Sequence, residues 1–398
     1  MVIEDVRYRI IFDSRGRETV ECEVESSGIV CRASAPSGAS TGSEEAVVVN
    51  PRKYGEIGEK VAKTLIGINV FDQEEVDNAL RSLDGTENFS NIGGNFAISA
   101  SIAVAKCASE ILGLPLCLYL GGVFAKEIPY PLGNVIGGGK HAEGSTNIQE
   151  FLVIPVGAKS FLEAQKANSE VHKKVREELK ARGIFSAKGD EGAWAAQISD
   201  KTAFEVLNRA IERVKNENSV EVRMGIDVAA SELWDGKKYV YSDKNLSRDQ
   251  QVEHILKIVE EYDLLYVEDP FHENDFESFS ELTKQVKCMV CGDDLFVTNV
   301  RRLKRGIELK AGNTLLVKPN QIGTLTDTFR AVKLAKDHGY SIVVSHRSGE
   351  TEDNYISHLA VAFNAKLIKT GVVGGERISK LNEMIRIEEM LKAKMVRI

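Results

Sequence analysis

Six short apolar runs in the second half of the chain each end in a polar or charged side chain of a type used in catalysis. The runs stop at Asp227, Glu268, Asp293, Lys318, His346 and Lys369. Between them lie amphipathic stretches with a helical period, such as DQQVEHILKIVEEY. Short β-branched runs that alternate with helices indicate repeated β/α units. In a (β/α)8 barrel the carboxyl ends of the strands open at one mouth, so we expect these six side chains around a single cavity.

The first part of the chain has a different pattern. Strand-like segments are expected at 1–11, 18–24 and 28–32, and helical patterns follow at 54–65, 73–83 and 95–111. Strands first and helices afterwards predict an α+β unit. Glycine and proline interrupt the pattern over 121–131. We therefore predict an N-terminal α+β capping domain at 1–126 and a catalytic (β/α)8-type barrel domain at 127–398.

Composition narrows the class of protein. The 398 residues carry a net charge of −8 and no long basic run, which argues against a nucleic-acid partner. The most apolar stretch, 97–120, carries Lys106 and Glu110 on a helical period, so we interpret it as a buried helix and expect no membrane association. The six cysteines are scattered, mostly in apolar runs. They predict reduced core thiols and a cytoplasmic location.

Three of the strand-end residues are carboxylates, namely Asp227, Glu268 and Asp293. Gathered at one mouth they would raise each other's pKa unless a cation lay among them. Ligation by oxygen alone suits Mg²⁺. The alternative is three independent, ion-paired strand ends.

Two lysines follow apolar runs at the same level. A lysine beside a dication and partly removed from water has a lowered pKa and can act as a base, which is the prediction for Lys318 and for Lys369. Either could instead be a solvated or ion-paired lysine. His346-Arg347-Ser348 combines a guanidinium fork with a hydroxyl and suits a phosphate or carboxylate, although a surface loop would also carry such residues.

Glycine-bearing loops lie outside the strand series. The segments 36–42 and 137–141 could close over a substrate as lids or could be plain connectors. Glu191 lies between glycines in GDEG, and Glu150 opens the apolar run FLVI at the edge of a strand. Each could equally be an ordinary surface acid.

Ordered motifs along the whole chain resemble the enolase family (phosphopyruvate hydratase). They are DSRGRETVE, PSGASTG, LDGTEN, GDEG, VEDPF, GDDLFVTN, NQIGTLT and SHRSGETED. The resemblance implies an enolase-type barrel and the reversible dehydration of 2-phosphoglycerate to phosphoenolpyruvate in glycolysis and gluconeogenesis. The alternatives are a divergent relative that acts on another phosphorylated hydroxy acid and a binding or scaffold protein.

The resemblance also implies roles for single residues. Mg²⁺ would be held by Asp227, Glu268 and Asp293, and a second ion by Ser40 with the substrate phosphate. Lys318 would be the base, Glu191 the acid and Glu150 its support, with a Mg²⁺-stabilised enediolate between the two proton transfers. Substrate would also be bound by His141, His346, Arg347, Ser348 and Lys369. A homodimer or larger homo-oligomer is expected.

The chain departs from the family pattern at a few positions. Ala193-Trp194 follow GDEG where a second glycine is usual, and Lys140 precedes His141 where a small residue is usual. The segment 371–377 is one residue shorter than usual and lacks its first arginine. These differences concern lid closure and substrate preference.

Overall fold

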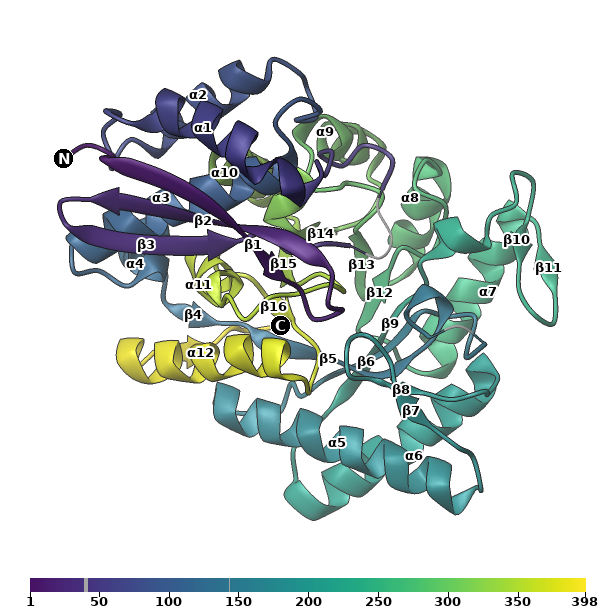
Figure 1. The fold of residues 1–398 in the computed structure, drawn as a ribbon. Helices are drawn as coiled ribbons and strands as arrows, with labels where there is room; N and C mark the ends of the chain where they lie inside the picture. Colours follow the sequence, from purple (N-terminus) through teal and green to yellow (C-terminus); the bar gives the residue numbers. More distant parts are fainter. Residues whose placement is uncertain (39–41, 143) are drawn as a thin grey trace.

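The computed structural model describes residues 1–38, 42–142 and 144–398 (Figure 1). Ser40, one of the residues expected to bind metal, therefore lies outside the described residues. The side chain of His141 does too, although its backbone is described.

The N-terminal part is an antiparallel meander covered by helices on one face. The strands are β1 (Asp5–Phe12), β2 (Glu18–Ser26) and β3 (Ile29–Ser34), and the helical elements are η1 (Pro51–Lys53), α1 (Tyr54–Leu65), α2 (Gln73–Asp84), α3 (Gly94–Ile111), α4 (Leu116–Gly121) and η2 (Gly122–Phe124). Val20, Cys22 and Val24 alternate along β2 and are fully buried. Tyr8 of β1 packs on Phe96 of α3 and donates a hydrogen bond to its carbonyl, which ties the sheet to the helix.

A closed barrel of eight strands follows in the described part of the chain. The strands are β5 (Tyr130–Gly137), β6 (Glu150–Ile154), β9 (Arg223–Asp227), β12 (Tyr266–Glu268), β13 (Met289–Gly292), β14 (Thr314–Val317), β15 (Ser341–Ser345) and β16 (Leu367–Lys369). The outer helices are α5 (Phe161–Ala181), α6 (Asp200–Asn218), α7 (Arg248–Glu261), α8 (Phe276–Gln285), α9 (Val300–Leu309), α10 (Leu325–Asp337), α11 (Tyr355–Ala362) and α12 (Gly375–Leu391). Pairing of β16 with β5 closes the ring.

The barrel departs from a regular (β/α)8 pattern at its second strand. A short connection containing η3 (Gly139–His141) joins β5 to β6, so β6 runs antiparallel to both β5 and β9. The helices α5 and α6 then follow in succession before β9 returns in the parallel direction. Because β6 is reversed, its first residue and not its last lies at the mouth, and Glu150 pairs with Asp227.

Several short strands and 3-10 helices lie outside the eight barrel strands. The hairpin of β7 (Ala187–Lys188) and β8 (Trp194–Ala195) extends the sheet next to β5, where Trp194 pairs with Ile136. The other elements are β4 (Glu127–Ile128) paired with β17 (Lys394–Met395), β10 (Tyr239–Val240) paired with β11 (Asn245–Leu246), η4 (Ala230–Leu233) and η5 (Pro319–Gln321).

Side-chain caps define where several outer helices begin. Ser160, Ser199 and Thr324 each accept a hydrogen bond from the backbone N–H three residues ahead, at the start of α5, α6 and α10. Ser247 and Gln250 form a complete capping box at α7. These caps satisfy backbone donors that the first helical turn leaves without a partner.

Membrane-spanning potential is confined to one bent pair of helices. Within the described ranges no single helix is long and apolar enough to cross a bilayer. Taken together, the helices Gly94–Ile111 and Leu116–Phe124 have the length and composition of a membrane span, but they are bent by 99° at the break between them.

The N-terminal part lies against the barrel, as Figure 1 shows for β1–β3, and it contacts the loop that follows β15. Ser37 exchanges backbone hydrogen bonds with Gly349, and Lys106 of α3 pairs with Asp353 at 2.6 Å. We retain the division into 1–126 and 127–398 as a proposal.

Candidate active site

The six strand-end residues converge on one mouth. Asp227, Glu268 and Lys369 are the last residues of β9, β12 and β16, while Asp293, Lys318 and His346 directly follow β13, β14 and β15. A cavity at this mouth is lined by all of these except Glu268, together with Glu150, Glu191, Arg347 and Ser348. The cavity holds about 20 Å³, which is room for about one water molecule, so a larger ligand must displace groups at the mouth.

Lys369 lies among three buried carboxylates. Its Nζ is 2.8 Å from Glu268 Oε2, 3.2 Å from Asp227 Oδ2 and 3.2 Å from Glu150 Oε2. Burial would lower the pKa of Lys369, but these carboxylates raise it well above its usual value. Lys369 is therefore a cation that offsets part of the negative charge of the mouth.

The carboxylates at the mouth also raise each other's pKa values. Burial and the neighbouring Asp227 raise the pKa of Glu268 to about 8. Burial and Glu191 raise the pKa of Glu150 well above its usual value. Excess negative charge in a dry site favours protons or added cations.

Lys318 forms an ion pair with Asp293 Oδ2, and Gln321 Nε2 donates to Asp293 Oδ1 at 2.8 Å. Burial raises the pKa of Asp293, but Lys318 and the other nearby cations bring it below its usual value. Burial likewise lowers the pKa of Lys318, but Asp293 raises it overall. In this arrangement Asp293 therefore outweighs desolvation at Lys318, and the lowered pKa expected for a lysine beside a dication stays a prediction.

Glu191 also lines the mouth, at the tip of the β7–β8 hairpin. It is buried, and its Oε2 accepts a hydrogen bond from Asn134 Nδ2 at 3.3 Å and lies 3.4 Å from His346 Nε2. Gly192 adopts φ +79°, and a Cβ there would meet the carbonyl of Val373 at 2.5 Å. The glycine that follows the acid is thus required by close packing.

Arg347 and Ser348 form the third group at the mouth. Arg347 Nη1 and Nη2 donate to the two oxygens of Glu45, at 2.9 and 3.2 Å, in a bidentate pair. Burial lowers the pKa of Arg347, but Glu45 raises it above its usual value. A buried guanidinium held in this way is oriented for an anionic group.

Several residues at the mouth were not expected from the sequence. Carboxylate oxygens of Asp269, Asp293 and Asp294 lie within 4.8 Å of one another. Asp269 directly follows Glu268 in VEDP, and Asp294 directly follows Asp293 in GDDL. Their position next to an expected ligand was the sequence signal that could have identified them. Asp269 also accepts the backbone N–H groups of Asp293 and Asp294, which gives it a structural role. Glu45 and Asn134 come from distant segments, and no local pattern marked them. Gln321 lies in the motif NQIGTLT, but no role was expected for it.

The donor set fits a divalent cation. Oxygens of Asp227, Glu268 and Asp293 are hard ligands of the kind that Mg²⁺ prefers. Burial and then repulsion from Asp227 raise the pKa of Glu268, and such an ion would relieve the repulsion. Lys318 pairs with Asp293, and Lys369 pairs with Glu268. A metal ion would therefore compete with these two ammonium groups for the same carboxylate oxygens.

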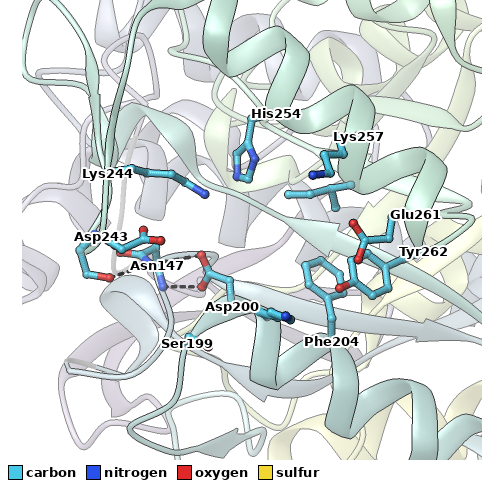
Figure 2. Close-up of a pocket in the computed structure, with 13 residues that line it drawn as sticks. Asn147, Ser199, Asp200, Phe204, Asp243, Lys244, His254, Lys257, Glu261 and Tyr262 are labelled. Carbon is cyan, nitrogen blue, oxygen red and sulfur yellow. Dashed lines mark hydrogen bonds between the residues drawn. The ribbon is translucent and has the colours of Figure 1, made fainter.

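A larger pocket of about 440 Å³ lies on the flank of the barrel, between α6, α7 and the segment around Ser242 (Figure 2). Asp200 accepts the N–H groups of Asn147 and Ile148, and Asn147 is also bonded to Ser242. These contacts anchor the connection that leads into Glu150. None of the expected site residues lines this pocket.

The fold and the mouth together define a class: an enzyme-type (β/α)8 barrel in which carboxylates, lysines and an arginine converge under an N-terminal cap. Family models identify it further. "Enolase, N-terminal domain" matches residues 3–120, and "Enolase, C-terminal TIM barrel domain" matches residues 125–397.

Curated relatives agree over the whole length. The chain is 70% identical over 399 residues to an enolase of Archaeoglobus fulgidus, covering 100% of both chains. It is 52% identical to an enolase of Halorubrum lacusprofundi, covering 97% of this chain and 98% of that one. An enolase of Methanothermobacter thermautotrophicus is 51% identical, with 98% and 96% covered. The chain belongs to the enolase family and is a lyase, a phosphopyruvate hydratase. Nothing in these comparisons favours the scaffold alternative.

Proposed function

We propose that the mouth catalyses the reversible dehydration of 2-phosphoglycerate to phosphoenolpyruvate, with Mg²⁺ held by Asp227, Glu268 and Asp293. The observation that carries the proposal is the placement of an amine, Lys318, and a carboxyl group, Glu191, on the same cavity. Ser40 is proposed as a ligand of a second ion, and a cytoplasmic homo-oligomer is proposed for the assembly.

In the proposed reaction a cation bound to Asp293 would replace the ion pair with Lys318 and so favour the neutral amine of Lys318. That amine then removes the proton from C2 of the substrate. The electron pair left at C2 forms the C2=C3 double bond as the C3–O bond breaks. The proton of Glu191 joins the departing hydroxide to give water, with Glu150 beside it as support. Mg²⁺, when bound, supplies positive charge next to the substrate carboxylate, where negative charge develops.

The remaining residues are proposed to hold the substrate. Lys369 would face its carboxylate, and Arg347 and Ser348 its phosphate. His141 and His346 would close the site around the leaving hydroxyl. The buried bidentate pair of Arg347 with Glu45 supports this assignment, because it leaves the guanidinium held in one orientation.

The two proton transfers can be tested separately. Lys318→Ala should abolish exchange of the C2 hydrogen with deuterated solvent as well as turnover. Glu191→Gln keeps the shape but has no proton to donate, so it should lose turnover and retain C2 exchange. Each loss should be ~10²–10⁴-fold. Turnover is followed as phosphoenolpyruvate formation, and exchange by NMR of recovered 2-phosphoglycerate.

Lys333→Ala is the matched control, because Lys333 is exposed on α10 and pairs only with Asp337 among the described residues. It should behave like the parent in both assays. Exchange that survives in Lys318→Ala and vanishes in Glu191→Gln would reverse the two roles. Turnover that is unchanged by chelation of divalent ions would contradict the metal assignment.

A further inference from the structure

Arg377, in the first turn of α12, is a fully buried arginine outside the set of residues assigned above. Its Nη1 donates to the carbonyl of Arg347 at 2.6 Å and contacts His346 Nδ1 at 2.8 Å. Its Nη2 donates to the carbonyls of Ser348 at 2.7 Å and Asp190 at 3.4 Å. One side chain thus joins the hairpin that carries Glu191 to the loop that carries His346.

These contacts determine which ring nitrogen of His346 carries the proton. A guanidinium has N–H donors and no acceptor. The nitrogen that faces Arg377 must therefore be an acceptor, so Nδ1 is unprotonated. A neutral imidazole then carries its hydrogen on Nε2. Burial keeps the ring neutral by lowering the pKa of His346 to about 4, and Arg377 adds to this effect.

The Nε2–H group points into the reacting part of the mouth. His346 lines the cavity with Glu191, and the two side chains are 3.4 Å apart at Nε2 and Oε2. Among the described residues, His346 Nε2 is buried without an aligned hydrogen-bond partner. A buried N–H group without a well-aligned partner can donate a hydrogen bond to a ligand, or to a neighbouring side chain that moves slightly.

We propose that Arg377 is a positioning residue that locks His346 as the Nε2–H tautomer and so keeps the proton of Glu191 available for the leaving hydroxyl. The proposal rests on the assignment of Glu191 as the acid. With the opposite tautomer, the lone pair of Nε2 would face the protonated Glu191 and accept its hydrogen. The acid would then be bonded to the imidazole and not to the substrate oxygen.

The tautomer itself can be observed without any reaction. Protein labelled with ¹⁵N-histidine, at neutral pH and loaded with Mg²⁺, should show His346 with a protonated Nε2 and an unprotonated Nδ1. The signal is assigned by its absence in His346→Gln. Arg377→Met has a side chain of similar length without a donor, and it should increase the Nδ1–H population. A wild-type ring protonated on Nδ1, or a tautomer ratio unchanged in Arg377→Met, would overturn the proposal.

Arg302→Met is the matched control for loss of a buried guanidinium. Arg302 is also buried and donates to the carbonyl of Leu295 and to Glu44, but it does not contact His346. It should lower stability and leave the His346 tautomer unchanged. A similar shift in both variants would indicate general loosening of the fold and would count against the lock.

The kinetic readout separates positioning from support of the fold. Arg377→Met should lose turnover by at least about tenfold while C2 exchange persists, because only the acid step is impaired. Arg377→Lys, which keeps a donor, should recover part of the loss. Equal loss of exchange and turnover in Arg377→Met would leave only a structural role and contradict the proposal.

A second pair of variants decides the matter if Arg377→Met does not fold. The amide nitrogen of His346→Gln can reach the position of Nε2, whereas that of His346→Asn lies near Nδ1. The Gln variant should retain at least about tenfold more turnover than the Asn variant, since it keeps a donor at the mouth. Equal turnover would contradict the lock. Full turnover in Glu191→Gln would instead refute the acid assignment, while the tautomer measurement would stand on its own.

Discussion

At the centre of the mouth, the ammonium group of Lys369 lies within 3.2 Å of oxygens of Glu150, Asp227 and Glu268. All four side chains are buried. Removing one partner of a buried ion pair is more costly than replacing both, because the remaining charge is uncompensated. The stability of this region therefore depends on cations, whether they come from lysine or from a bound metal.

Lys369→Met should lower the free energy of unfolding by about 3–5 kcal/mol in EDTA, because three buried carboxylates lose their shared cation. Mg²⁺ should recover part of the loss, and its stabilising effect should be larger in the variant than in the parent. Urea unfolding with EDTA or Mg²⁺ measures both effects. Lys333→Met, at the exposed pair with Asp337, is the control and should change little. Equal stabilisation of parent and variant by Mg²⁺ would be inconsistent with this prediction.

His346 should make the protein less stable in mild acid. Its pKa is about 4 in the folded chain and 6.5 ordinarily, so the unfolded chain binds the extra proton between these values. The contribution of neutral His346 to the free energy of unfolding is complete above pH 6.5. It is lost as the pH falls toward 4, by about 3 kcal/mol in total. Urea unfolding of His346→Gln should accordingly depend less steeply on pH in this window. Parallel curves for parent and variant would show that the imidazole does not titrate as stated.

At the scale of elements, the reversed strand β6 brings Glu150 into the site. Glu150 is the first residue of β6, and in a parallel strand it would lie at the opposite end of the barrel from Asp227. The tight connection between β5 and β6 makes the reversal possible, because antiparallel neighbours need only a short link. Within that connection, Gly138 donates to the carbonyl of Gln149, and Thr146 Oγ1 donates to the carbonyl of Ile148.

Gly138→Ala should disrupt this connection. A Cβ at Gly138 would lie 2.0 Å from Thr146 Oγ1 and 2.6 Å from the Thr146 carbonyl, so the backbone must shift. We expect a loss of about 1–3 kcal/mol in stability and a larger relative loss of turnover, since Glu150 moves with the connection. Gly55→Ala in α1 meets nothing within 4 Å and should be neutral or slightly stabilising. Full activity in Gly138→Ala would show that the connection does not position Glu150.

Across the whole molecule, the N-terminal part contributes carboxylates that pair with buried arginines of the barrel. Glu45 pairs with Arg347 and Glu44 with Arg302, and each pair joins residues more than 250 positions apart in sequence. Buried donors and acceptors at this boundary would lose their partners if one part unfolded alone. The site is consequently a property of both parts.

The two parts should unfold in one cooperative transition. Calorimetry should give a single peak, and hydrogen exchange should show α3 and the barrel strands opening with the same free energy. Arg347→Met removes the bidentate pair with Glu45 and should broaden or split the peak. Two well-separated peaks in the parent would mean that the proposed domains are energetically independent.

Local pattern was sufficient for much of the fold. The helix expected at 54–65 is α1, and the helix expected at 95–111 is α3 with one residue added at its start. The strand expected at 1–11 begins only at Asp5. The first and last residues of a strand or helix depend on strand pairing and helix capping, and the spacing of apolar residues carries no information about either.

The sequence by itself determined that Asp227, Glu268, Asp293, Lys318, His346 and Lys369 end or follow strands and therefore share one mouth, because strand direction and alternation are local properties. Only the tertiary structure decided the direction of β6, the ion pair that raises the pKa of Lys318, and the contacts of Glu45 and Arg377 with the site. Those features depend on contacts between different segments of the chain. Their contacts are decided by packing, and no residue pattern within one segment encodes them.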